Sequence, residues 1–321
     1  MSEKKDSYTK NALMSFSDSI QTVADNVSQS VVSIRPRGGG SGSGVVWTID
    51  GHIVTCSHLI RRADEVEVRL NNGISFPAKV IGNDPYSDVA LLKIEANNTG
   101  TTPIKQIEIA DSENLKAGQL VLALANPYGE YPSITQGIIT SERSSLTGWW
   151  SRGASTMMDN IVITDARLNP GYSGGPLVDV EGKMIGLNAA YVSSRGIAIR
   201  ANKVRSIADQ LVKDRMIKRA HLGIVTEDIS LPPDVSSRVD PKQEGGLIVL
   251  SVEEASAAKK AGLFIGDVIV KFNGEAITNV HDLRRHLLKQ DIIGKSAKLA
   301  IIRAERKTEL TITPDEGVRS N

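Results

Sequence analysis

The sequence predicts a mainly β protein in which a domain of short strands precedes a smaller α+β domain. Residues 28–200 contain many short apolar runs, and turn signals such as Asp-Gly and Asn-Gly separate them. A helical pattern at 203–214 closes this region, and strand patterns then alternate with helical patterns up to residue 315. Short strands without helices between them favour a β-barrel or β-sandwich, and the later mixture favours a second domain.

The N-terminal segment, residues 1–27, begins with a polar stretch. Apolar residues at helical spacing between residues 17 and 27 then predict a short helix. Two strand-like runs come next, "VVSI" (31–34) and "VVWTI" (45–49), and the stretch "GGGSGSG" (38–44) joins them. We expect this stretch to be a mobile hairpin connection, because no helix follows it and no lysine stands where a phosphate-binding loop needs one.

Eight further runs complete the first predicted domain, which spans residues 28–214: "HIVT", "EVEVRL", "ALLKI", "LVLALA", "IVIT", "PLVDV", "MIGLNAAYV" and "IAIR". The second predicted domain spans residues 218–315. It combines four strand-like runs, "GGLIVLSV", "DVIVKFNG", "AKLAIIRA" and "ELTITP", with the helical patterns "SAAKKAG" and "NVHDLRRHLLKQ". We place His281 and His286 on the protein surface, because two arginines between them mark a solvated helix face.

The composition excludes several classes of function. The chain of 321 residues carries 38 Lys and Arg against 37 Asp and Glu, so it has no strong field that would recruit nucleic acid or anionic lipid. Cys56 is the sole cysteine, which excludes an internal disulfide and a cysteine-rich zinc site, and we expect no metal or cofactor. The N-terminus lacks the apolar core of a signal peptide, and no apolar run reaches the roughly 18 residues that span a bilayer. We therefore expect a cytoplasmic protein, or a periplasmic or otherwise extracytoplasmic one if a leader or anchor was removed.

The stretch "NPGYSGGPL" (169–177) makes Ser173 a candidate nucleophile of one of two enzyme classes. It fits G-x-S-x-G, the nucleophile elbow of α/β-hydrolases, and also G-x-S-G-G-P, the serine neighbourhood of chymotrypsin-like proteases. An elbow needs a helix directly after the serine, and Gly174, Gly175 and Pro176 cannot begin a buried helix. The local sequence therefore favours the second class, in which histidine comes first, then aspartate, then serine.

Two further residues complete that order. His58 ends the apolar run "IVTCSH", which brings its imidazole to the edge of a barrel, whereas His52 lies in a turn. Asp88 stands directly before the strand-like run "VALLKI". Taken singly, the three residues could be an interface histidine, a cap and a turn serine. Their order and their flanking strands together predict a catalytic triad.

Peptide-bond hydrolysis gives each residue of the triad a task. The Ser173 hydroxyl is a weak nucleophile at neutral pH, so His58 takes its proton during attack and returns it to the leaving amine. Asp88 fixes the imidazole tautomer and stabilises the imidazolium. The backbone N–H groups of Gly171 and Ser173 form the predicted oxyanion hole, and Gly171 is free to take a positive φ.

At these residues the chain resembles the HtrA (Deg) family of serine proteases. The segment "GSGVVWTIDGHIVTCSHLI" resembles the family's histidine segment, "DPYSDVALLKI" its aspartate segment, "LALANPYG" its Asn-Pro-x-Gly turn and "TDARLNPGYSGGPLVD" its serine segment. The motif "HLGI" (221–224) and the run "GGLIVLSVEEASAAKKAGLFIGDVIVKFNGEAI" resemble the family's PDZ domain. The resemblance covers residues 17–314, nearly the whole chain.

The resemblance implies a chymotrypsin-like double β-barrel domain followed by one PDZ domain. It also implies an ATP-independent endopeptidase of protein quality control and stress response, which cleaves unfolded or misfolded proteins. Such proteins assemble as homo-oligomers, usually trimers built through the N-terminal segment. The family's specificity pocket favours small aliphatic residues, and three residues here correspond to it: Ile197, Ala198 and Leu168. This pocket contains no acidic residue that would indicate trypsin-like cleavage. In the PDZ domain, peptide C-termini would be held by the backbone N–H groups of three residues: Leu222, Gly223 and Ile224.

Three positions depart from the family pattern. Tyr172 replaces the usual Asn before the serine, Arg167 replaces a small residue, and Arg200 replaces a common Pro. If Tyr172 keeps the catalytic loop collapsed, the protein is a gated binding module or chaperone instead. A third alternative, an elbow-type esterase, would need one of the later histidines as its base: His221, His281 or His286. The pair Trp149 and Trp150 is either a contact surface or a loop that covers its own aromatic rings.

Overall fold

The computed structural model describes residues 2–36, 40–60, 63, 65–94, 104–141, 145–151, 154–233, 235–236, 243–288 and 292–317. Residues 2–10, 145–151 and 154–159 are described by their backbone alone. The chain forms two compact units, Met1–Ile217 and Lys218–Asn321. Strands outnumber helices in both units, which confirms the predicted mainly β fold class.

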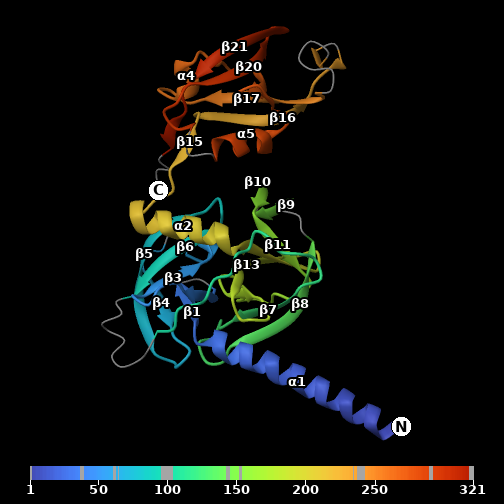
Figure 1. Cartoon of the computed structure of the whole chain (residues 1–321). Helices are drawn as coiled ribbons and strands as arrows, with labels where there is room; N and C mark the ends of the chain where they lie inside the picture. The colour runs from blue at the N-terminus through green and yellow to red at the C-terminus, as the bar shows by residue number, and fades with distance from the viewer. Residues whose placement is uncertain are drawn as a thin grey trace. The chain divides into compact units, whose positions relative to one another are not determined.

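The first unit opens with helix α1 (Ser2–Ser28), which leads into two closed β-barrels (Figure 1). The helix is longer than the short one that the sequence predicts, and its residues 11–19 are exposed. Its last turns pack apolar side chains, Val23 and Val27 among them, into the core of the barrels. The apolar stripe of this helix continues into its exposed part, where Leu13 and Phe16 precede Ile20 at helical spacing.

Each barrel closes from six antiparallel strands. The first has the order β1-β2-β3-β6-β5-β4, with β1 (Val31–Pro36), β2 (Gly42–Val46), β3 (His52–Thr55), β4 (Glu65–Arg69), β5 (Ser75–Asp84) and β6 (Val89–Ile94). The second has the order β11-β14-β13-β12-β7-β8, with β7 (Leu120–Ala125), β8 (Ser133–Ser141), β11 (Ile161–Thr164), β12 (Pro176–Val178), β13 (Met184–Val192) and β14 (Arg195–Arg200). This pair of barrels confirms the chymotrypsin-like architecture that the resemblance implies.

Four smaller elements complete the first unit. They are the hairpin of β9 (Ser145–Ser151) and β10 (Ala154–Asp159), the 3-10 helix η1 (Ser57–Ile60) and helix α2 (Ala201–Asp214). Trp149 and Trp150 lie in β9, but their side chains fall outside the described part of the chain. The expectation of an aromatic contact surface therefore stays a prediction.

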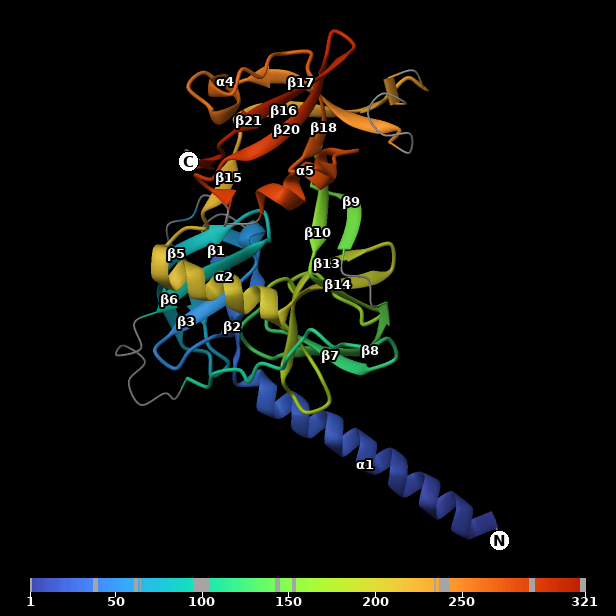
Figure 2. The same cartoon turned by 45° about the horizontal axis from the view of Figure 1, so that its top comes forward.

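One apolar core joins the two barrels. It combines side chains of the first barrel, such as Leu91, with side chains of the second, such as Leu187 and Ile199. Figure 2 shows α2 lying across strands of the first barrel, and Val204 and Leu211 of this helix belong to the same core. Fully burying a side chain of this kind contributes about 1.5–3 kcal/mol to the stability of the fold. The shared core therefore stabilises the packing of the two barrels against each other.

Part of the glycine-serine stretch is a buried strand. The sequence predicts a mobile connection over 38–44, but β2 begins at Gly42 and its residues are buried. The reason is close packing: a Cβ atom at Gly44 would lie 3.0 Å from side-chain carbons of both Ile34 and Ile53. Glycine and serine are used here for their small size, not for flexibility, and the expectation was wrong for residues 42–44.

The second unit is a small domain built around one main β-sheet. Its main sheet has the order β16-β17-β18-β20-β21, with β16 (Ile224–Ser230), β17 (Gly245–Val252), β18 (Val268–Phe272), β20 (Ala297–Arg303) and β21 (Arg306–Ile312). The short strand β19 (Glu275–Ala276) pairs with β18, and β15 (Arg219–His221) pairs with β22 (Asp315–Gly317). Helices α4 (Ala257–Lys260) and α5 (Val280–Leu287) accompany the sheet.

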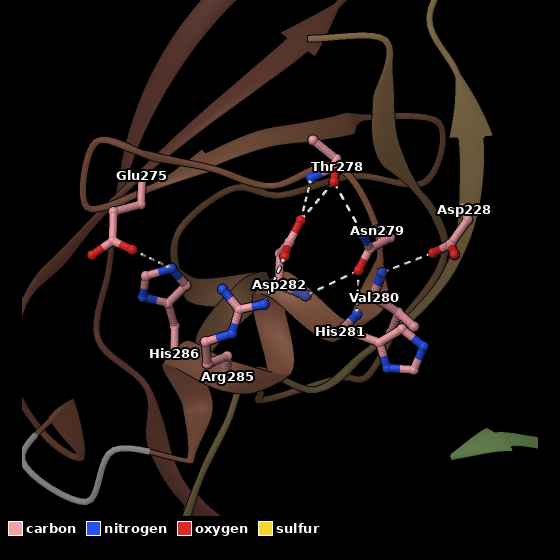
Figure 3. A network of polar contacts seen from close by, with 9 residues as sticks. All are labelled: Asp228, Glu275, Thr278, Asn279, Val280, His281, Asp282, Arg285 and His286. Carbon is pink, nitrogen blue, oxygen red and sulfur yellow. Dashed lines mark hydrogen bonds and ion pairs between the residues drawn. The ribbon is translucent and has the colours of Figure 1, made fainter. Parts of the chain in front are cut away.

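A polar network fixes the start of α5 (Figure 3). The Asn279 side chain accepts hydrogen bonds from the backbone N–H groups of His281 (2.9 Å) and Asp282 (3.1 Å), which caps the helix. The Asp282 carboxylate accepts hydrogen bonds from the backbone N–H and the hydroxyl of Thr278. Burial by itself would raise the pKa of Asp282, but these bonds outweigh it and lower the pKa. Asp228 of β16 accepts a hydrogen bond from the first helical N–H group at 2.8 Å.

The surface position predicted for His286 is wrong. Its side chain is buried, its ring centroid lies 5.2 Å from that of Phe272, and its Nε2 lies 3.5 Å from a carboxylate oxygen of Glu275 (Figure 3). His286 and Leu283 lie three positions apart on one face of the helix, and this face packs onto the sheet. His281 is half-buried, so the neighbouring arginines did not indicate how either histidine is placed.

Candidate active site

Strand pairing in the first barrel brings His58 and Asp88 together. His58 lies in η1, directly after β3, and Asp88 lies directly before β6, which pairs with β3. The His58 Nδ1 atom is 2.7 Å from Asp88 Oδ2, and the His58 backbone N–H donates to Asp88 Oδ1 at 2.9 Å. Because a carboxylate only accepts hydrogen bonds, this contact places the ring proton on Nδ1 and leaves Nε2 as an acceptor.

A tight turn presents the Asp88 carboxylate. The Asp84 side chain accepts hydrogen bonds from the backbone N–H groups of Tyr86 (3.3 Å) and Ser87 (3.2 Å). Asp88 follows with a φ of 55°, in the left-handed region that aspartate tolerates better than most residues. The aspartate-rich segment before β6 is therefore a turn whose last residue faces the histidine.

Cys56 lies beside this pair, but its thiol is held in the neutral form. Its Sγ atom, one ring nitrogen of His58 and one carboxylate oxygen of Asp88 all lie within 4.8 Å of one another. The side chain is fully buried and donates to the Asn188 carbonyl at 3.3 Å. Burial, reinforced by the negative charge of Asp88, raises the pKa of the Cys56 thiol well above its usual value. A protonated buried thiol is a poor nucleophile and a poor metal ligand, so it does not compete with Ser173.

Ser173 lies in a loop that reaches the same region from the second barrel. Two turn hydrogen bonds shape the loop, from Tyr172 N to Asn169 O and from Gly175 N to Tyr172 O, each at 3.0 Å. A Cβ atom at Gly174 would collide with the Thr55 hydroxyl, which places the loop against the segment that carries His58. The Ser173 hydroxyl donates to the Ala189 carbonyl at 3.1 Å, and within the described chain no hydrogen bond joins it to His58. Such contacts are often long before substrate binds.

The backbone N–H groups of the loop around Ser173 differ in whether they are hydrogen-bonded. Those of Tyr172, Gly174 and Gly175 are all hydrogen-bonded. Those of Gly171 and Ser173, the predicted oxyanion hole, have no hydrogen-bond acceptor among the residues that the structure describes. Gly171 has a φ of 91°, and the close approach of Pro127 leaves no room for a Cβ atom there. Among the described residues, the N–H groups of Gly171 and Ser173 are therefore available as donors next to the serine in the chain.

The predicted pocket residues do not all lie together. Leu168 and Ala198 share one apolar cluster in the second barrel, whereas Ile197 belongs to a different cluster. Successive residues of a strand point to opposite faces, which separates Ile197 from Ala198. The Tyr172 ring is buried in the cluster of Leu168 and Ala198, a contact that its position next to the serine did not reveal. Burial raises the pKa of Tyr172, and a hydrogen bond with Thr135 partly offsets this effect.

The two other departures from the family pattern lie apart from this cluster. The Arg167 side chain is exposed, and Arg200 is buried. The Arg200 guanidinium donates to backbone carbonyl groups of Ile161 (3.2 Å) and Ser112. Arg200 therefore fastens the loop before β7 to the start of α2, which is a structural contact.

The predicted carboxylate-binding loop lies between β15 and β16. Gly223 has a φ of 73°, and the Ser256 side chain leaves no room for a Cβ atom there. The carbonyl groups of Leu222 and Gly223 accept hydrogen bonds from Ala258 N (2.9 Å) and Glu253 N (2.8 Å). In the described chain, the N–H groups of Leu222 and Gly223 have no acceptor. Ile224 begins the edge strand of the sheet.

Comparison with known proteins finds two matching domain families and several similar proteases. Residues 42–187 match the trypsin-like peptidase domain family, and residues 220–313 match the PDZ domain family. A probable periplasmic serine endoprotease DegP-like of Pseudomonas putida (strain W619) is 34% identical over 278 residues, which are 85% of this chain and 55% of that protein. The periplasmic pH-dependent serine endoprotease DegQ of Escherichia coli (strain K12) is 33% identical over 290 residues, covering 88% of this chain and 61% of that protein. The chain thus spans little more than half the length of these relatives.

A solved structure extends the likeness. The HtrA-type protease AlgW with a tripeptide superposes with a TM-score of 0.72 at 25% identity, covering 93% of this chain and 97% of that one. None of the described helices is both long enough and apolar enough to cross a membrane. The cytoplasmic location expected from the sequence is wrong, because the bacterial relatives above are named as periplasmic proteases.

Proposed function

Because the chain belongs to the HtrA (Deg) family of serine proteases, we propose that it is a serine endopeptidase whose triad is His58, Asp88 and Ser173. We assign the protease domain to residues 28–214 and the PDZ domain to residues 218–315. The observation that carries the proposal is the contact of 2.7 Å between His58 and Asp88, which leaves Nε2 free to accept a proton.

The proposed reaction proceeds through an acyl-enzyme. The Ser173 hydroxyl leaves the Ala189 carbonyl and attacks the peptide carbonyl carbon, while His58 Nε2 takes its proton. The negative charge on the carbonyl oxygen is stabilised by the N–H groups of Gly171 and Ser173. His58 then gives the proton to the leaving amine, and the peptide bond breaks. Water, activated by the same imidazole, hydrolyses the ester and restores the serine.

We propose that the substrates are unfolded or misfolded proteins, cleaved without ATP after small aliphatic residues. The apolar cluster of Leu168, Ala198 and Tyr172 supports this preference, because it carries no charge that would favour a charged substrate side chain. We also propose that the protein forms a homo-oligomer, with a trimer as the expected size. The exposed apolar side chains of α1, among them Leu13 and Met14, support such an assembly.

Unfolded casein should yield fragments whose new C-terminal residues are mostly small and aliphatic. Mass spectrometry of digests by the wild type and by Ser173→Ala tests this expectation, and the variant serves as the control for contaminating proteases. If both proteins instead prevented a client from aggregating and neither produced fragments, the protein would be a binding module or chaperone, and the endopeptidase proposal would be wrong.

The PDZ loop is expected to bind free peptide C-termini. A charge-assisted hydrogen bond contributes about 1.5–3 kcal/mol, so amidation of a binding peptide should weaken its affinity roughly tenfold or more. Fluorescence anisotropy with a peptide in its acid and amide forms measures this difference. Equal affinities of the two forms would show that the N–H groups of Leu222 and Gly223 do not hold a carboxylate.

A further inference from the structure

We infer that Ser43 is a positioning residue, which reaches from the first barrel and holds the loop that carries Ser173 and the oxyanion hole. This inference rests on the proposed function. Ser43 belongs to the glycine-serine stretch that the sequence presents as a connection, and no step of the proposed reaction uses it. Its contacts nevertheless join two segments that lie 128 positions apart in the chain.

Every polar group of Ser43 is engaged. The residue is fully buried in β2. Its hydroxyl donates to the Gly171 carbonyl at 2.8 Å and accepts from the Asn126 backbone N–H at 2.8 Å. Its backbone N–H donates to the Ser173 carbonyl at 2.9 Å, and its own carbonyl accepts from the Thr55 hydroxyl at 2.7 Å. Ser43 therefore holds two of the loop's carbonyl groups and is itself held by two neighbours.

These contacts restrict the loop one peptide group at a time. The peptide group between Gly171 and Tyr172 is fixed by Ser43 at its carbonyl and by Asn169 at its N–H. The peptide group after Ser173 is fixed by Ser43 at its carbonyl and by the Asn188 carbonyl at its N–H, at 2.8 Å. Since peptide groups are planar, holding the carbonyl oxygen also fixes the direction of the N–H group.

One peptide group of the loop is left without such bonds. Within the described chain, neither the Pro170 carbonyl nor the Gly171 N–H is hydrogen-bonded. The direction of this N–H depends on the position of the Gly171 α-carbon, which the Ser43 hydroxyl secures through the adjoining carbonyl group. Without that hydroxyl, the Gly171 carbonyl and the Asn126 N–H both lose a buried partner, and the loop can turn away from its donor geometry. Loss of the donor geometry should destabilise the transition state, in which the oxyanion forms, more than it weakens substrate binding.

Ser33 provides a matched control. It pairs with Ser43 across β1 and β2, is equally buried, and donates its hydroxyl to the Pro127 carbonyl of the second barrel at 3.2 Å. Both Ser33→Ala and Ser43→Ala remove one buried hydroxyl that joins the two barrels. They differ in that only the Ser43 hydroxyl contacts the loop that carries Ser173, within the described residues.

Kinetics of the full chain on a peptide substrate test the inference. Ser43→Ala should lower kcat about 10- to 100-fold with KM changed less than about threefold, and it should weaken binding of a peptide boronate inhibitor by the same factor as kcat. Ser33→Ala should keep kcat within about threefold of the wild type. Equal losses of kcat in the two variants, or an unchanged kcat in folded Ser43→Ala, would overturn the inference.

Hydrogen–deuterium exchange separates this inference from the proposed function. The amides of residues 169–175 should exchange faster in Ser43→Ala than in Ser33→Ala, whether or not the wild type cleaves peptides. Unchanged exchange in both variants would contradict the positioning role, whereas an inactive wild type with this difference would contradict only the protease proposal. If Ser43→Ala does not fold, Thr55→Val removes the hydroxyl that holds the Ser43 carbonyl and should give a smaller change of the same kind.

Discussion

Replacing Ser173 with alanine is expected to lower kcat by roughly 10⁶-fold, the size of loss seen when the nucleophile of a serine protease is removed. The hydroxyl oxygen forms the acyl bond, and no other described side chain can take its place, because the neighbouring Cys56 thiol is buried and neutral. The change removes a single hydrogen bond, to the Ala189 carbonyl, so the fold should persist. Peptide cleavage, fluorophosphonate labelling and thermal unfolding of the variant measure both effects.

Cys56→Ala is the control for this experiment. Cys56 lies beside the same histidine and aspartate, so it is the residue that could act as an alternative nucleophile. Labelling should remain in Cys56→Ala and disappear in Ser173→Ala. The opposite pattern, with labelling kept in the serine variant and lost in the cysteine variant, would refute the assignment of Ser173.

Asp88→Asn is expected to lower kcat by roughly 10⁴-fold while KM changes little. An asparagine amide group can donate a hydrogen bond to Nδ1 of His58, so the ring proton moves to Nε2. The imidazole then presents a proton to Ser173 where it must accept one. The contact of 2.7 Å in the wild type makes this change of tautomer the main consequence of the substitution. Steady-state kinetics of the variant on a peptide substrate measure the loss.

Asp84→Asn tests whether Asp88 acts on the imidazole or only shapes the turn. The Asp84 side chain is buried and accepts two backbone hydrogen bonds in the same turn, and no hydrogen bond or ion pair described by the structure joins it to His58. Its asparagine variant keeps one side-chain oxygen as acceptor and should retain kcat within about tenfold of the wild type. Similar large losses in both variants would mean that Asp88 acts through the shape of the turn.

The sequence determined the fold class and the order of the predicted catalytic residues. Short apolar runs between turn signals indicate strands. The alternation of apolar and polar residues along a strand depends only on which of its residues face the core and which face solvent. The glycines and proline after Ser173 excluded an elbow for a local reason, namely that they cannot begin a helix. The segments ending in His58 and beginning with Asp88 could be identified in the same way, since each adjoins its own strand.

The tertiary structure decided how residues from distant segments meet. Ser43 reads as part of a flexible glycine-serine stretch, yet its hydroxyl bonds to Gly171 of the other barrel. His286 looked solvated from its arginine neighbours and is packed on Phe272, and Tyr172 turned out to be buried in the second barrel. The physical reason is the same in each case. The local sequence pattern determines the backbone conformation and the periodicity of buried residues. The partner of a side chain depends instead on how the barrels close and pack, and this packing brings together residues more than a hundred positions apart.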